Sequence, residues 1–201
     1  TWREAEDQGD PANLDYGEHI RLRVAVANIG GGDASNYQYQ VQYASTTGNC
    51  ATDPGGWVTV PVDAGSGEHF EMATSTYFNN SDPTSNRLSD DGYTFVAGEM
   101  VKDPNNISGG ITTSEDEFTE VEFSLQPTLD APVGQTYCFR TTDNGSDLDY
   151  YDRYAELTMG GVDNDAPVFT TQPSDGNSAT ATPTNYGELV NFSATASDAE
   201  D

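Results

Sequence analysis

The stretches EHIRLRVAVAN, over Glu18–Asn28, and YQYQVQYA, over Tyr37–Ala44, alternate apolar with polar residues along their length. Successive side chains of a β-strand point to opposite faces, so this period of two predicts strands that each turn one face to a core. Between them, the glycine-rich Ile29–Asp33 predicts a turn. The core-facing rows are Ile20, Leu22, Val24 and Val26 in the first strand, and Tyr37, Tyr39, Val41 and Tyr43 in the second.

The same pattern continues along the first 161 residues. Turn-forming residues recur about every 8–12 positions, as in all-β folds, and no stretch shows an apolar period of 3.6 that would indicate a helix. Further strands are expected at Trp57–Val62, His69–Thr74, Tyr93–Ala97, Glu117–Gln126, Gln135–Thr142 and Arg153–Met159. We predict an all-β sandwich over residues 1–161, with a core of Ile20, Leu22, Val24, Tyr39, Val41, Val121, Phe123, Leu125, Tyr137, Phe139 and Leu157.

Two details of this prediction concern polar regions. In Glu117–Gln126 the inward row includes Thr119 and Val121, which leaves Glu120 and Glu122 to face water. The long segment of residues 75–116 is rich in Asn, Asp, Ser and Gly and contains only one expected strand. Because it exceeds an ordinary loop, it is an insertion, a contact surface or a solvated loop.

The last 40 residues differ from the rest. Two strand-like runs, Pro167–Gln172 and Glu188–Ser197, follow an acidic junction at Val162–Phe169. Two or three strands cannot close a sandwich, so residues 162–201 predict a linker and an incomplete second β-domain. Either further chain or another molecule would supply the missing strands.

The chain is strongly acidic, with 34 Asp and Glu against 7 Lys and Arg and a formal net charge of −27. Such a surface repels nucleic acids and anionic membranes, so we expect neither as a partner. Three interpretations of the acidity compete: solubility through self-repulsion, divalent-cation binding, and adaptation to a salty habitat. The sequence contains no apolar run long enough to span a membrane. Its first residues, Thr1–Glu4, are those expected of a mature or trimmed chain and not of a signal peptide.

The only cysteines are Cys50 and Cys138. Since Tyr137 and Phe139 are expected to face the core, Cys138 points outward, toward the loop Thr46–Gly56 that contains Cys50. The pair is either a disulfide or two free thiols; an extracellular composition favours the disulfide. Closing a loop of this length contributes about 4 kcal/mol in the chain-entropy description.

Several blocks of the chain resemble known bacterial surface proteins. Ile20–Ala44 is similar to the cell-adhesion-related immunoglobulin-like domains of bacteria. Five further blocks resemble, in the same order, an immunoglobulin-like repeat found in very large secreted proteins of environmental bacteria. These blocks are Trp2–Asp7, Phe95–Glu99, Thr119–Gln126, Tyr137–Arg140 and Tyr154–Thr158. The resemblance implies an immunoglobulin-like β-sandwich, with a long insertion at about 75–116, at the cell surface.

The acidic junction is similar to the calcium-binding linker of cadherins. Asp163, Asn164 and Asp165 match its first acidic motif, and Asp198 and Glu200 its second, although the order of Asn and Asp departs from the cadherin pattern. Calcium takes six to eight oxygen ligands, most of which these two clusters could supply together. The alternative is a polar hinge with solvated carboxylates. Asp143–Asp149 also gathers oxygens but lacks the spacing of an EF-hand loop.

No catalytic constellation is present, so we expect no enzyme. His19 and His69, the only imidazoles, are each expected at an exposed strand edge, and no serine-hydrolase, zinc-protease or phosphate-loop motif occurs. Asn-x-Ser sequons make Asn79, Asn106, Asn144 and Asn191 candidates for glycosylation.

Two functions remain open. In the first, the chain is a subunit of an extracellular, pilus-like filament, a homopolymer in which a strand of one copy completes the sheet of another. The donor candidate is Trp2–Asp7, that is Trp2, Arg3, Glu4, Ala5, Glu6 and Asp7, on a tether over Gln8–Gly17. In the second, it is a carbohydrate- or protein-binding adhesin repeat in a large monomeric surface protein.

The calcium hypothesis predicts a metal-dependent stability. Saturating calcium at about 100 times its Kd adds about 2.7 kcal/mol to the unfolding free energy of the site that binds it. We expect a chelator to lower the melting temperature of the chain, and Asp163→Asn with Asp165→Asn to abolish that response. If the chelator changes neither the melting temperature nor the arrangement of the two parts of the chain, this junction is a hinge without a metal.

Overall fold

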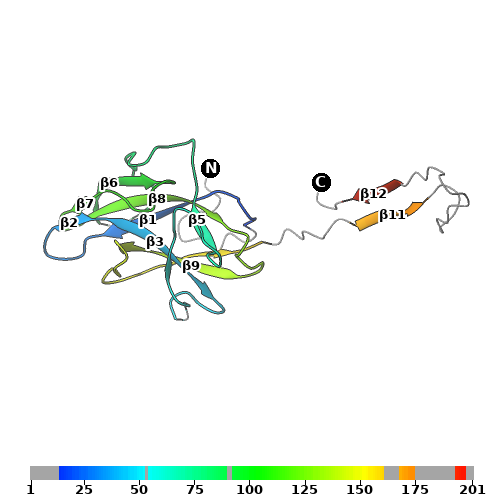
Figure 1. Cartoon of the computed structure of the whole chain (residues 1–201). Coiled ribbons are helices and arrows are strands. Elements are labelled where there is room, and N and C mark those ends of the chain that lie inside the picture. The colour runs from blue at the N-terminus through cyan, green and yellow to red at the C-terminus, as the bar shows by residue number, and fades with distance from the viewer. Residues whose placement is uncertain (1–13, 53, 90–91, 161–167, 175–192, 198–201) are drawn as a thin grey trace, which may run out of the picture. The chain divides into compact units, whose positions relative to one another are not determined.

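The structure is a computed structural model that describes residues 14–52, 54–89, 92–160, 168–174 and 193–197 (Figure 1). All regular elements in this part of the chain are strands, which confirms the predicted all-β class. The chain divides into two compact units, Thr1–Gly161 and Val162–Asp201.

The first sheet is built around strand β8 (Glu117–Pro127). Strand β1 (Ile20–Ala27) pairs antiparallel with one edge of β8. The opposite edge is shared by β5 (Phe70–Met72), antiparallel, and β6 (Thr94–Val101), parallel. Almost the whole length of β8 is therefore paired on both sides.

The second sheet has the order β10-β9-β3-β4 and is antiparallel throughout. Its strands are β3 (Tyr39–Thr46), β4 (Val58–Thr59), β9 (Thr136–Asp143) and β10 (Ala155–Thr158). A separate short pair is formed by β2 (Ala34–Tyr37) and β7 (Ile111–Thr113).

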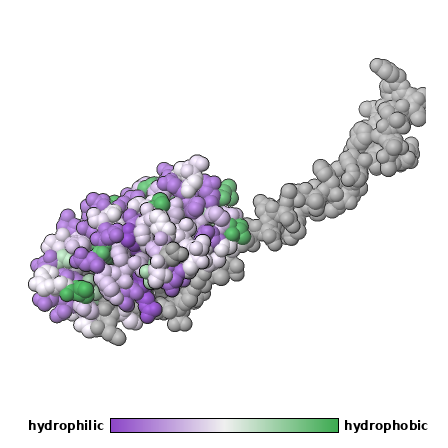
Figure 2. Space-filling model, turned by 90° about the horizontal axis from the view of Figure 1, so that it is seen from below, coloured by the Kyte–Doolittle hydropathy of each residue, from purple (hydrophilic) through white to green (hydrophobic). Residues whose placement is uncertain are grey.

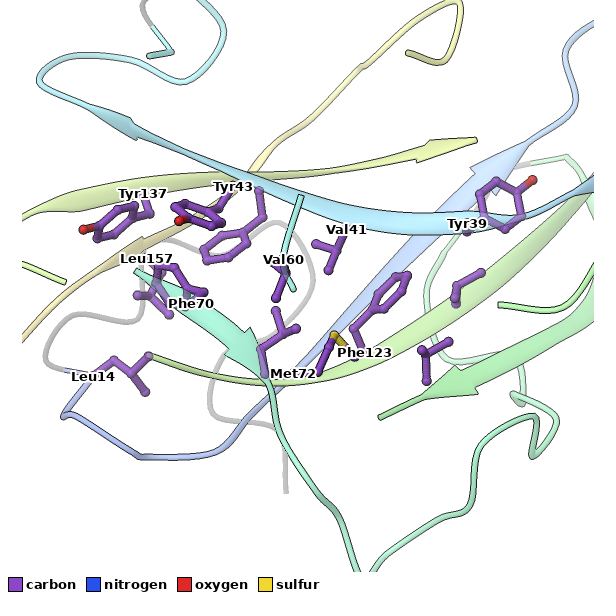
Figure 3. Close-up of a cluster of buried hydrophobic side chains, with 14 of the residues drawn as sticks. Leu14, Tyr39, Val41, Tyr43, Val60, Phe70, Met72, Phe123, Tyr137 and Leu157 are labelled. Atoms are coloured by element: carbon purple, nitrogen blue, oxygen red, sulfur yellow. The ribbon is translucent and has the colours of Figure 1, made fainter. Parts of the chain in front are cut away.

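Aromatic residues join the two sheets. The ring of Phe70 on β5 packs edge-on against Tyr43, Tyr137 and Phe139 of the other sheet, with centroid distances of 5.2, 4.9 and 5.0 Å. Figure 3 shows Phe70, Tyr43 and Tyr137 together with aliphatic side chains of the core. Of the predicted core, Tyr39, Val41, Val121, Phe123, Leu125, Tyr137, Phe139 and Leu157 are buried, whereas Ile20, Leu22 and Val24 are only partly buried against it.

The segment of residues 75–116 is more regular than predicted. Strand β6 extends to Val101, and β7 was not expected at all. The chain before β6 runs back along its free edge, with an antiparallel bridge between Pro83 and Glu99. A Cβ on Gly98 would lie 2.2 Å from the carbonyl oxygen of Glu120, so only glycine fits where β6 approaches β8. Much of this segment is thus part of the first sheet.

The second unit contains a two-stranded antiparallel ribbon of β11 (Val168–Ser174) and β12 (Ser193–Ser197). Its register shifts twice, between Phe169 and Thr171 and between Thr171 and Ser174. Strands therefore occur in both runs where the sequence predicts them.

The predicted disulfide is confirmed: Cys50 and Cys138 are bonded, with their Cα atoms 5.5 Å apart. Cys138 alternates with the core residues Tyr137 and Phe139, so it lies on the outer face of β9. It is nevertheless fully buried, because the loop containing Cys50 covers it. The bond attaches this loop to the second sheet.

Loss of this bond is expected to destabilise the first unit. Replacing both residues, as Cys50→Ala with Cys138→Ala, should lower the unfolding free energy by roughly 2–4 kcal/mol in urea denaturation, since the unfolded chain regains the freedom of the closed loop. The intact protein should also show no alkylatable thiol by mass. Two reactive thiols in the folded protein would contradict the disulfide.

Candidate functional site

Strand β1 is the outermost strand of the first sheet among the described residues. All eight of its residues pair with β8, and no strand of the described part of the chain pairs with its other side. Asn28 donates its backbone N–H to the carbonyl of Glu117, in continuation of the β1–β8 register. Because hydrogen-bonded pairs alternate in an antiparallel ladder, the N–H groups of Arg21, Arg23, Ala25 and Ala27 point away from β8.

The core-facing row of β1 is incompletely covered. Leu22 and Val24 are partly buried, as are Ile20 and Val26, whereas their direct partners on β8 are completely buried. Those partners are Phe123, Val121, Leu125 and Thr119, each 0% exposed. The apolar core thus reaches the surface of the sandwich along β1.

The chain crosses from one sheet to the other beside this edge. Leu14 is fully buried and forms a parallel bridge with Met159, just after β10. Its N–H donates to the carbonyl of Thr158 (3.4 Å), and its carbonyl accepts from the N–H of Gly160 (3.0 Å). Since β1 begins at Ile20, the edge strands β1 and β10 lie on the same side of the sandwich.

Buried charges hold β1 to β8 on the outer face of the first sheet. Glu122 accepts hydrogen bonds from Arg21 and, at 2.6–2.7 Å, from Nη2 and Nε of Arg23. Arg23 Nη1 also donates to Glu120 Oε2 at 2.6 Å and to the carbonyl of Ser85 at 2.7 Å. Both carboxylates are 0% exposed, and the Arg23 side chain is 4% exposed.

The prediction that Glu120 and Glu122 face water is therefore wrong. The reason is the segment Ser81–Leu88, which lies over this face: Glu120 Oε1 accepts the backbone N–H groups of Arg87 (2.6 Å) and Leu88 (2.9 Å). Thr84 Oγ1 donates to the carbonyl of Glu120 at 2.8 Å. A sequence signal existed, because the outward row of β1 carries two of only seven Lys and Arg residues and the outward row of β8 is acidic.

The predicted glycosylation candidates are in different environments. Asn79 and Asn144 are exposed. Asn106 Nδ2 instead donates to the carbonyl of Val60 at 3.1 Å, which commits that side chain to the fold. Asn191, the donor candidate Trp2–Asp7 and the calcium candidates Asp163, Asn164, Asp165, Asp198 and Glu200 lie outside the described residues.

One of the two predicted imidazoles has a different environment from the one expected. His69 is packed between aromatic rings rather than exposed at an edge, with its Nδ1 2.8 Å from the hydroxyl of Tyr137. Burial raises the pKa of that hydroxyl well above its usual range. No group of three or more His, Cys, Asp or Glu suited to a metal ion occurs in the part of the chain that is described.

A helix of sufficient length and apolar character to cross a membrane does not occur among the described residues. No protein-family model, curated protein or solved structure matches this chain. The candidate site therefore consists of strand β1 and the charged residues Arg21, Arg23, Glu120 and Glu122 that attach it to β8.

The buried charge network makes a testable prediction. Glu120→Ala leaves the buried Arg23 with Glu122, which Arg21 also shares, as its carboxylate partner and removes the acceptor of two backbone N–H groups. It should lower the unfolding free energy by about 3–5 kcal/mol. Glu115→Ala, at an exposed position of the turn before β8, should change it by less than about 0.5 kcal/mol. Equal effects of the two substitutions in urea denaturation would show that the network does not stabilise β1.

Proposed function

We propose that this chain is a structural subunit of an extracellular, pilus-like bacterial filament, assembled by strand donation between copies. The single observation that carries the proposal is the position of β1 as the outermost described strand of the first sheet, with an apolar row that is only partly buried. A donated strand would pair with outward backbone groups such as those of Ala25 and Ala27 and cover the apolar row in one step.

The topology supports an immunoglobulin-like sandwich. In that fold one sheet has the order A-B-E-D and the other contains C, F and G. The orders β1-β8-β5 and β3-β9-β10 correspond to B-E-D and C-F-G, with β4 added beyond β3. The position beside β1 is then that of strand A, at the sheet edge. This is the strand that a neighbouring copy would donate.

The setting supports an extracellular location. A buried disulfide persists in oxidising compartments and is rare in reducing ones. The net charge of −27 keeps separate copies soluble through mutual repulsion, so a specific backbone-paired contact is needed for assembly.

The donor in this proposal is Trp2–Asp7 of a neighbouring copy. Its tether is shorter than the sequence predicts, because Leu14 is bonded to the β10 side and Gly17 donates to the carbonyl of Pro127 at 3.2 Å. Residues 8–13 remain, which reach about 20 Å when extended. The acidic donor would approach β1 beside Arg21, whose side chain is 38% exposed. The competing occupant is the same segment of the same chain.

A pair of complementary variants tests strand donation. A chain lacking residues 1–8 keeps the acceptor edge but has no donor. Ala25→Pro keeps the donor but removes an outward N–H from an exposed edge position, where proline is tolerated without loss of the β1–β8 ladder. The native chain should form fibres in negative-stain images, each variant should remain a folded monomer, and an equimolar mixture of the two should form dimers in light scattering.

Ala25→Thr retains the N–H and should polymerise normally. Intramolecular closure would be shown by a loss of monomer stability on removal of residues 1–8, with no dimer on mixing. Fibres formed by the shortened chain would exclude Trp2–Asp7 as the donor.

A further inference from the structure

A cluster of three aromatic rings and one arginine lies on the second sheet, away from β1. Trp57 stacks on Tyr154 and Tyr154 on Tyr151, with centroid distances of 5.7 and 5.6 Å and interplanar angles of 21° and 24°. The Arg140 guanidinium carbon lies 4.4 Å from the Trp57 ring centroid and 5.4 Å from that of Tyr151. None of these four residues belongs to the hydrophobic core.

The cluster occupies the outer face of this sheet. Phe139 is buried in the core, so Arg140 beside it on β9 points outward, where it is paired in register with Gln42 of β3. Both aromatic segments that contribute rings are loops next to edge strands: Trp57 precedes β4, and Tyr154 precedes β10. Strand β9, the loop before β4 and the loop before β10 are distant in the sequence. All three contribute large side chains to one outer surface, and these side chains are not part of the core.

Hydrogen bonds hold the cluster rigid. Gln42 Oε1 accepts from Nε and Nη2 of Arg140 at 2.9 and 2.8 Å, and Asp147 Oδ1 accepts from Nη2 at 2.6 Å. The Tyr151 hydroxyl donates to the carbonyl of Thr141 at 2.8 Å and accepts from the N–H of Leu148 at 3.0 Å. Burial raises the pKa of Tyr151, so this hydroxyl remains a donor at neutral pH. A preorganised surface of this kind loses little conformational entropy when it binds a ligand.

Polar groups surround the rings. The side chain of Asp147 is 64% exposed, and the neighbouring Tyr150 is 67% exposed with its hydroxyl 3.4 Å from Asp152. Aromatic surface beside a small number of fixed polar groups is the usual composition of a small-molecule site. The C–H face of a sugar ring can pack on an aromatic ring while its hydroxyls bond to carboxylate, amide and phenol groups. We propose that this cluster of Trp57, Arg140, Tyr151 and Tyr154, together with the neighbouring Tyr150, binds a neutral glycan.

Charge and area favour a neutral glycan over other ligands. Arg140 is already bonded to Asp147, and Arg153 in the Tyr150–Tyr154 segment is accompanied by Asp149 and Asp152. Because the chain also carries a net charge of −27, an anionic glycan would be repelled. A stable protein partner would need about 800 Å² of surface with an apolar centre. Of the exposed large apolar residues in the described ranges, only Val58 and Tyr150 adjoin the cluster in sequence. On the face seen in Figure 2, apolar residues form separate spots.

A single-tryptophan protein tests the proposal. The chain has two tryptophans, so Trp2→Phe leaves Trp57 as the only one and makes its fluorescence a reporter of the site. The probes are laminarin, yeast mannan, xylan, galactan and chitohexaose, each titrated into the full chain. We expect a saturable change in Trp57 emission with at least one of them. Binding should be independent of residues 1–8, so filament assembly and glycan binding can fail separately.

Two variants connect binding to the cluster. Tyr154→Ala should weaken binding at least ~10-fold, which is about 1.4 kcal/mol, and Tyr150→Ala, at an exposed position that the fold tolerates, should weaken it about threefold or more. Tyr77→Ala is the matched control, because Tyr77 is 84% exposed and not part of the cluster. It should leave the affinity unchanged.

The proposal is overturned if none of the five glycans changes the Trp57 emission, or if Tyr150→Ala and a folded Tyr154→Ala bind as the parent does. A glycoprotein that binds equally well before and after enzymatic removal of its glycans would identify a protein partner instead.

Discussion

The fold depends on strand β8 being satisfied on both of its faces and both of its edges. Its inward row of Val121, Phe123 and Leu125 forms the centre of the core. Its outward row would place Glu120 and Glu122 in an apolar environment without compensation, were it not for Arg23 and the backbone N–H groups of the covering segment. A buried carboxylate is tolerated only when it is paired and hydrogen-bonded, so the position of β1 and that of Ser81–Leu88 are determined together.

This constraint explains how β1 is fixed at the side of the first sheet. Arg21 and Arg23 attach it to β8 from the outer face, and a continuous ladder attaches it through the backbone. Among the described strands β1 is the outermost of its sheet, and its apolar row is only partly buried. Assembly at this edge would use the first sheet, whereas a glycan would meet the outer face of the second. The two proposed functions therefore require no shared residue, and one filament subunit could also present a ligand site.

Much of the fold could be predicted because its local pattern and its tertiary role agree. The alternation in Tyr37–Ala44 and Gln135–Thr142 predicts strands, and most of each segment lies in a strand of the second sheet, β3 or β9, although Tyr37 itself ends β2. The disulfide followed from the position of Cys138 between two core aromatic residues. The aromatic cluster was not predicted, because Trp57, Arg140 and Tyr154 come from separate elements and no single segment indicates that they meet.

The sequence by itself therefore determined the all-β class, the core-facing rows of the main strands and the disulfide, since each depends on side-chain alternation within a short segment. Only the tertiary structure decided that Glu120 and Glu122 are buried, that β6 pairs in parallel with β8, and that β7 forms at all. Those outcomes depend on contacts between segments far apart in the chain. Ser81–Leu88 covers a face of β8 that would otherwise be exposed. The periodicity within one strand does not indicate which other segment of the chain will pack against that strand.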